Sequence, residues 1–232
     1  MTKFCISVTS DTVCPWCYIG RRQLQRAQSL WLQQAANTGD SFSVTFLPYQ
    51  LEPAWPRGPD SSRDKQQFYS SKFGAQRTRL MQQRLDLVGS QLGISFRHGG
   101  RTGNSRDSHR LVHLAKAYGN GVELAVVDGL FAAYFEKEQD ITSHHVLRDI
   151  ATRAGIPAQD FQEELVDGDR GGAEVDAAAS LARSRGITGV PFFDFQSRFH
   201  VSGARDAKDF LHIFEKIKAH ENGQDVSDTE LD

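Results

Sequence analysis

Residues 64–168 show helical periodicity without a strand pattern, and this long block constrains the fold more than any other feature of the chain. Apolar side chains recur three or four positions apart, as in helices that bury one face. Gly119 and Gly155 are typical helix ends, and Arg97–Arg106, with three glycines, is expected to be a loop. A parallel sheet built from successive strand–helix–strand units would need strands here. The apolar groups are Met81, Leu85, Val88 and Leu92; Leu111, Leu114, Ala115 and Tyr118; Val127, Leu130, Phe131, Tyr134 and Phe135; and Val146, Leu147 and Ile150.

Strand patterns flank this helical block on both sides. Residues 4–9 alternate between apolar and smaller side chains, and residues 42–47 form a second strand-like segment that ends in a proline-rich stretch. Near the C-terminus, residues 192–195 and 199–202 are short strand candidates joined by a polar turn. The chain therefore offers four strands for a sheet, two before the block and two after it.

Helices complete the pattern around these strands. Pro15 suits a first helical position, and the apolar residues that follow it have helical spacing up to Trp31. An alanine-rich helix ends at Gly186, and a closing helix contains Phe210 and Phe214. The order predicts an α/β fold in which residues 1–60 and 170–220 form one sheet-and-helix domain with its own core. Residues 61–169 then form an all-helical insertion domain, and residues 221–232 a flexible acidic tail.

The composition limits the kinds of partner and the cellular location that we expect. With 27 Lys and Arg against 29 Asp and Glu, the net charge of −2 gives no whole-protein field for nucleic acid or an anionic membrane. No apolar run approaches the roughly 20 residues of a membrane span, and the first residues leave no room for a signal peptide. Three cysteines are too few for a secreted disulfide framework. We expect a cytoplasmic protein whose cysteines are catalytic or redox-sensing.

The chemistry centres on Cys14-Pro15-Trp16-Cys17, between the first strand and the first helix. Helix N-termini favour a thiolate, and two intervening residues let a second thiol reach the first. The alternatives are half of a zinc site, which lacks a second cysteine pair here, or two core cysteines. Cys5 is expected to be a small buried residue in its strand. The motif has no histidine, and Pro15 and Trp16 add no positive charge, which favours exchange or reduction over strong oxidation.

A second motif, Gly189-Val190-Pro191-Phe192-Phe193, lies far downstream. Together with Ser10-Asp11-Thr12-Val13-Cys14-Pro15-Trp16-Cys17-Tyr18-Ile19-Gly20, it resembles the FrnE-like branch of the DsbA family, which is related to 2-hydroxychromene-2-carboxylate isomerase and kappa-class glutathione transferase. The resemblance implies a thioredoxin-like fold with a helical insertion. It also implies that Cys14 is the nucleophile, Cys17 the resolving thiol, Pro191 a cis-proline facing them, and Val190 a source of backbone hydrogen bonds to substrate.

Further residues are candidates for substrate contacts. Asn104–Arg110 resembles a family stretch that lines the active-site cleft, so Asn104 and His109 are expected there, together with Trp16 and Asp11 beside the thiols. Each has a structural alternative. Asn104 could form part of a turn, Asp11 could be a turn or helix-capping residue, and His109 could be a histidine whose hydrogen bonds are satisfied within the fold. In its functional role, Asp11 could accept a proton during exchange. His109 and His113 lack an evident third ligand, so no metal site is expected.

Three functions remain open at this point. The first is thiol–disulfide exchange with a disulfide-containing protein or a small thiol such as glutathione. The second is glutathione-dependent isomerisation or transfer. The relatives with this activity have a serine at the position of Cys14, and this difference weighs against the second function. The third is a non-catalytic redox-sensing or metal-binding module. No tightly bound cofactor is expected, glutathione is a possible co-substrate, and the oligomeric state is not predicted.

Overall fold

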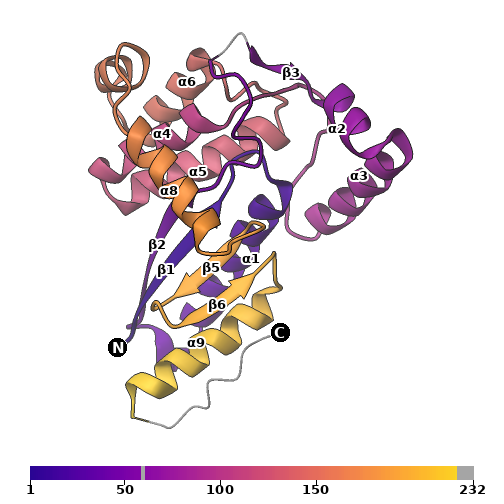
Figure 1. Ribbon diagram of the computed structural model, residues 1–232. Helices are drawn as coiled ribbons and strands as arrows, with labels where there is room; N and C mark the ends of the chain where they lie inside the picture. The colour runs from indigo at the N-terminus through magenta and orange to yellow at the C-terminus, as the bar shows by residue number, and fades with distance from the viewer. Residues whose placement is uncertain (59–60, 224–232) are drawn as a thin grey trace.

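The computed structural model describes residues 1–58 and 61–223. In this part of the chain a four-stranded sheet has the order β2-β1-β5-β6, with β1 parallel to β2 and antiparallel to β5 (Figure 1). β5 and β6 form an antiparallel hairpin. The four strands predicted from the sequence are therefore confirmed. They are β1 (Lys3–Ser10), β2 (Ser41–Pro48), β5 (Phe192–Phe195) and β6 (Phe199–Ser202).

The alternating pattern of β1 sets which face of the sheet is buried. Phe4, Ile6 and Val8 are at most 2% exposed and pair in register with apolar residues of β2 on the same face. Cys5 points to the other face and is exposed, so the expectation of a buried Cys5 is wrong. The physical reason is that helices cover the two faces unequally. At Cys5 the backbone instead exchanges hydrogen bonds with Gln196, at 2.8 and 2.9 Å.

Two helices, α1 (Pro15–Leu32) and α9 (Ala207–Glu221), pack against each other and against the apolar face of β1. An aromatic cluster joins them, because the rings of Trp31 and Phe214 lie 5.5 and 5.0 Å from the ring of Phe4. Asp206 starts α9 with a capping box. Both helices were expected from apolar spacing. Among the described residues, no helix has the length and apolar character needed to cross a membrane.

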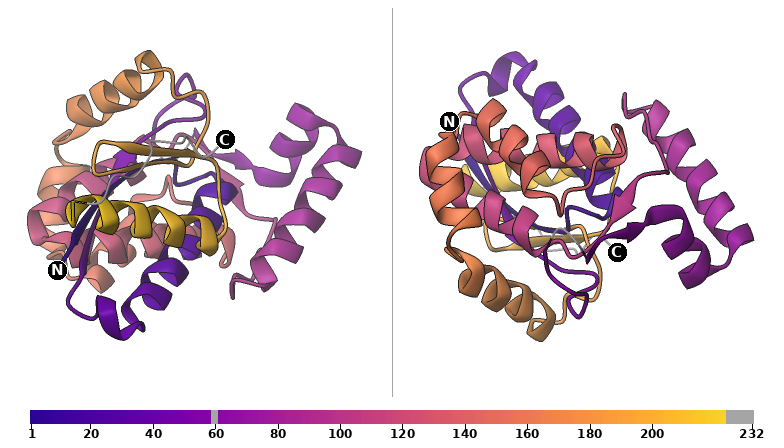
Figure 2. Two further views of the ribbon diagram at one scale, coloured as in Figure 1. Left: turned by 90° about the horizontal axis from the view of Figure 1, so that it is seen from below. Right: turned by 90° about the horizontal axis from the view of Figure 1, so that it is seen from above.

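The middle of the chain is helical, as predicted. α4, α5 and α6 pack together, and α8 lies against α4 and β2, whereas α2 and α3 project to one side of the molecule (Figure 2). The helices are α2 (Lys65–Phe73), α3 (Ala75–Ser90), α4 (Arg106–Ala115), α5 (Asn120–Phe135), α6 (His144–Ala154), α7 (Ala158–Phe161) with a π-helical turn at Gln162–Val166, and α8 (Gly172–Ser184). Short 3₁₀ turns occur at Ala35–Asn37 and Lys116–Tyr118.

The insertion contains one strand pair that the sequence did not predict. β3 (Arg63–Asp64) pairs antiparallel with β4 (Arg101–Thr102), within the segment expected to be a loop. The insertion is therefore not entirely helical. Two residues are too few for an alternating pattern, which explains why no strand was expected there. This pair joins the two ends of the α2–α3 projection.

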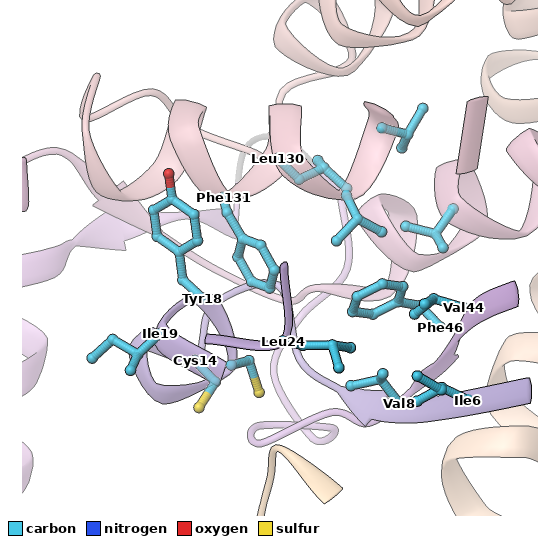
Figure 3. Close-up of a cluster of buried hydrophobic side chains, with 14 of the residues drawn as sticks. Ile6, Val8, Cys14, Tyr18, Ile19, Leu24, Val44, Phe46, Leu130 and Phe131 are labelled. Carbon is cyan, nitrogen blue, oxygen red and sulfur yellow. The ribbon is translucent and has the colours of Figure 1, made fainter. Parts of the chain in front are cut away.

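The insertion and the sheet share one core. Tyr18 of α1 stacks on Phe131 of α5 with ring centres 5.1 Å apart, and Figure 3 shows the two rings side by side. Arg21 holds Asp128 of α5 through two hydrogen bonds of 2.9 and 3.0 Å. Within the described residues, most buried apolar side chains of both parts belong to one cluster, contrary to the expectation of one core for each part. Domain boundaries near residues 60 and 170 stay a prediction. In the predicted acidic tail, residues 224–232 lie outside the described residues.

Candidate active site

Cys14 lies at the N-terminal end of α1, immediately before Pro15. Its backbone N–H donates to the Asp11 carbonyl at 3.1 Å, and its own carbonyl accepts the N–H groups of Cys17 and Tyr18. A tight turn thus leads directly from β1 into the helix. The Cys14 side chain makes no capping hydrogen bond and is 5% exposed, and it stands at the N-terminal end of α1, the end of a helix whose dipole favours negative charge.

Cys17 lies one turn further into α1 and is 2% exposed. Burial raises the pKa of its thiol well above the ordinary value, and the neighbouring Cys14 acts in the same direction. The Ser10 side chain and the Asp11 backbone lower this pKa in part. All three cysteines are free thiols. The dithiol is thus built asymmetrically, with one sulfur at the helix end and a second that is kept protonated beneath it.

The segment before β5 meets Cys14 across the fold. The Cys14 Sγ lies 3.5 Å from the Val190 carbonyl oxygen and donates to it, and the Val190–Pro191 peptide bond is cis. Pro191 is buried against α1, since a Cβ added to Gly20 would lie 3.0 Å from its Cγ. Two motifs that are distant in the sequence therefore meet at Cys14, and Pro191 follows a cis peptide bond as the resemblance implied. Hydrogen bonds from the Val190 backbone to a substrate stay a prediction.

Asp11 and His109 are brought together beneath this site. The fully buried Asp11 carboxylate accepts the Leu51 N–H at 2.7 Å and lies 3.3 Å from His109 Nε2. The same nitrogen is 2.9 Å from the Tyr49 carbonyl oxygen, and because a carbonyl only accepts, Nε2 carries a proton. His109 is thus a satisfied helix histidine. Contact of either residue with substrate stays a prediction.

Asn104 and Trp16 occupy different environments. Asn104 is 5% exposed, donates to the Trp55 carbonyl at 2.8 Å and accepts the Arg106 N–H at 2.9 Å. These contacts match the turn-forming alternative and hold the loop after β2. Trp16 is 38% exposed next to Cys14, so its indole is available to a partner. No cluster of three potential metal ligands occurs in residues 1–58 and 61–223.

A small cavity beside the dithiol includes residues that sequence reasoning missed. It has a volume of about 50 Å³, and Pro15 forms part of its wall together with Lys65 and Tyr69 of α2. Burial raises the pKa of the Tyr69 phenol, and Cys14 contributes in the same direction, which indicates that the two groups are close. No motif marks Lys65 or Tyr69, because both lie on a short helix whose position depends on the tertiary structure. The other lining residues are Thr78, Met81, Gln82, Leu85, Phe96, Arg97, His98 and Phe135.

Lys65 should make the stability of the protein depend on alkaline pH. It is 3% exposed, and its ammonium donates to the Tyr134 carbonyl at 2.8 Å. Burial lowers its pKa to about 8, although Glu138 and Asp140 oppose the shift. The unfolded chain, with an ordinary lysine pKa, then binds more protons than the folded protein above pH 8, so stability rises with pH. We expect Lys65 itself to add on the order of 1–2 kcal/mol to the free energy of unfolding from pH 8 to about 9.5. Cys17 acts in the opposite direction over this range, because its raised pKa keeps the folded thiol protonated while the unfolded thiol ionises.

Urea unfolding of wild type and Lys65→Met across this range tests the prediction. The difference in stability between wild type and the variant should change by about 1–2 kcal/mol in favour of wild type as pH rises, because the contribution of Cys17 is common to both proteins. The range stops near pH 9.5 because Tyr18, whose pKa is raised to about 12, and other buried phenols lower stability once unfolded tyrosine begins to ionise. An equal rise in both proteins would show that another group is responsible.

Comparisons with known proteins agree with this geometry. The DSBA-like thioredoxin domain matches residues 5–215, and the chain belongs to that family. It resembles the probable DsbA oxidoreductase SCO1869 from Streptomyces coelicolor, with 26% identity, a TM-score of 0.80, and coverage of 99% of this chain and 94% of that one. The uncharacterized protein YwbO of Bacillus subtilis (strain 168) is 24% identical over 190 residues, which cover 81% of this chain and 84% of YwbO.

A more distant structure has the same fold. 2-Hydroxychromene-2-carboxylate isomerase matches with a TM-score of 0.67 and 13% identity, over 94% of this chain and 98% of that one. The set of relatives is consistent with the FrnE-like branch expected from the two motifs. The isomerase also shows that members of this fold can have other activities, so the family alone does not define the reaction.

Proposed function

We propose that the protein is a thiol–disulfide oxidoreductase that works through Cys14 and Cys17. The observation that carries the proposal is the position of the Cys14 sulfur, at the first turn of α1 and 3.5 Å from the Val190 carbonyl. A sulfur placed there is stabilised as thiolate by the helix and faces a backbone segment that can align a substrate. Cys17, directly beneath it, can complete the exchange.

The reaction has two steps. The Cys14 thiolate attacks one sulfur of a substrate disulfide, the substrate S–S bond breaks, and the departing sulfur takes up a proton. Cys17 then loses its proton and attacks the Cys14 sulfur, which releases the second substrate thiol and leaves a Cys14–Cys17 disulfide. Two molecules of an external thiol return the pair to the dithiol form: the first forms a mixed disulfide with Cys14, and the second releases it as the disulfide of the external thiol. The buried Asp11, three residues before Cys14, is a carboxylate that could accept a proton.

The partners follow from this chemistry. We propose disulfide-containing proteins as substrates and a small thiol such as glutathione as reductant, in the cytoplasm and without a tightly bound cofactor. Trp16 and the Val190 backbone would contact the substrate. Trp16 is 38% exposed, and the Val190 carbonyl oxygen already accepts a hydrogen bond from the Cys14 thiol. The uncharged Pro15-Trp16 pair favours reduction or exchange over strong oxidation.

The decisive experiment is an equilibrium titration of the protein against reduced and oxidised glutathione, read by mass after acid quenching. An internal Cys14–Cys17 disulfide should form, and Cys14→Ser should neither form it nor reduce insulin disulfides. Insulin reduction by Cys14→Ser would overturn the mechanism. A glutathione-dependent isomerase would instead keep its activity in Cys17→Ser, which separates the two functions.

A further inference from the structure

The α2–α3 projection has a charge that differs from the rest of the chain. Residues 61–101, here called the basic arm, contain β3, α2, α3 and the first residue of β4. In Figure 2 its two helices stand apart from the main body. The arm has only two acidic residues, Asp64 and Asp86, whereas the whole chain has 29 acids against 27 Lys and Arg. Its basic residues are Arg63, Lys65, Lys72, Arg77, Arg79, Arg84, Arg97 and Arg101.

Most of these cations are free to meet a partner. Arg77, Arg79, Arg84 and Arg97 are exposed, and none has an ion-pair partner within residues 1–58 and 61–223. Isolated surface cations are ordinarily just solvated. Here, however, they share one projecting element on a chain whose remainder is acidic. Such an arrangement produces a local positive field that attracts anionic partners.

The basic arm borders the dithiol directly. The cavity beside Pro15 is formed largely by arm residues, and its wall is apolar at Met81, Leu85 and Phe96. On the outer side of α3, Leu80 and Leu87 are 59% and 55% exposed. They are seven positions apart and therefore share one helix face with Arg84. The arm thus offers apolar contacts in the cavity beside Pro15 and, among its cations, on the outer side of α3.

The spacing of the cations favours a polymer over a small molecule. Arg77 and Arg84 are seven residues apart on α3, which corresponds to about 10 Å along the helix. A ligand that contacts both, and also reaches Cys14, must be an extended chain. Among extended anionic chains, a polypeptide can carry the disulfide on which Cys14 acts.

We propose that the basic arm recognises an acidic polypeptide segment next to the substrate disulfide, with an apolar substrate side chain in the cavity beside Pro15. This inference rests on the proposed function and names its substrate class. Electrostatic attraction would bring acidic substrates to the dithiol and disfavour basic ones, mainly through the rate of association. The preference should weaken as salt screens the charges.

Three disulfide-bonded peptides of equal length test the proposal, with acidic, neutral or basic residues around the same apolar residue and cystine. For wild type, kcat/KM for the acidic peptide should exceed that for the basic one by about tenfold at low salt, and the ratio should approach one at about 0.5 M salt. In Arg77→Glu/Arg79→Glu/Arg84→Glu the preference should reverse.

A matched control is Arg153→Glu/Arg185→Glu/Lys208→Glu, which reverses three exposed charges outside the basic arm. It should retain the wild-type preference, and circular dichroism should show both variants folded. Equal kcat/KM for all peptides in wild type, or the same loss in the control, would overturn the inference. Tight binding of a single-stranded oligonucleotide without any peptide preference would also overturn it. Failure to reduce the neutral peptide would instead contradict the proposed function.

Discussion

Cys17→Ser should trap the protein as a covalent mixed disulfide with its substrate. Cys14 remains at the end of α1 and can still attack, but the residue beneath it can no longer resolve the product. Multiple-turnover reduction should therefore be lost, while up to about one substrate chain accumulates per protein. Non-reducing electrophoresis followed by mass analysis would identify the adduct and the cysteine that holds it.

The trapping experiment with Cys17→Ser needs a control for the exposed Cys5. Because Cys5 is accessible and Cys17 is buried, an adduct through Cys5 could imitate the expected product. The experiment should therefore use a Cys5→Ser background, which is expected to keep wild-type activity. An adduct that forms in Cys5→Ser/Cys14→Ser, in which Cys17 is the remaining thiol, or full turnover by Cys17→Ser, would contradict the two-cysteine mechanism.

Phe214→Ala should cause the largest loss of stability expected for a single substitution. Phe214 is fully buried, and its ring lies between 4.9 and 6.2 Å from the rings of Phe4, Trp31, Phe42 and Phe195. These partners come from α1, β1, β2 and β5, so the resulting cavity would lie where both halves of the sheet domain meet. We expect a decrease of about 3–5 kcal/mol in the free energy of unfolding.

Urea unfolding followed by tryptophan fluorescence measures this decrease. Leu181→Ala provides the control, because Leu181 is 49% exposed and its truncation should change stability by no more than about 0.5 kcal/mol. A change in Phe214→Ala as small as that of the control would show that the aromatic cluster is not central to the fold.

The sequence predicted the parts of the fold that depend on regular patterns. Strands with several alternating residues, such as residues 4–9, were found with nearly correct bounds, and helices with long apolar stripes were found at the expected places in the chain. The two-residue strands β3 and β4 could not be found, because their pairing depends on how the α2–α3 projection returns to the body. Cys5 was misplaced for a related reason, since alternation shows that two faces differ without showing how well each is covered.

The site was predictable where a motif fixes it locally. Cys14 and Cys17 follow from four consecutive residues at a helix start, and Pro191 and Val190 needed the resemblance to connect them to these thiols. Lys65 and Tyr69 could not be predicted, since nothing near them in the sequence relates them to Pro15. The charge of residues 61–101 was visible in the sequence. Only the fold shows that this charge lies beside the dithiol.

The position of β5 has a consequence for synthesis of the protein. The central strand β1 pairs on one side with β5, whose first residue is Phe192, and the carbonyl facing Cys14 belongs to Val190. During translation the Cys-x-x-Cys motif emerges long before either of these segments exists. A nascent chain therefore presents its thiols without the opposing backbone, and redox competence arises only when this high-contact-order pairing forms near the end of translation.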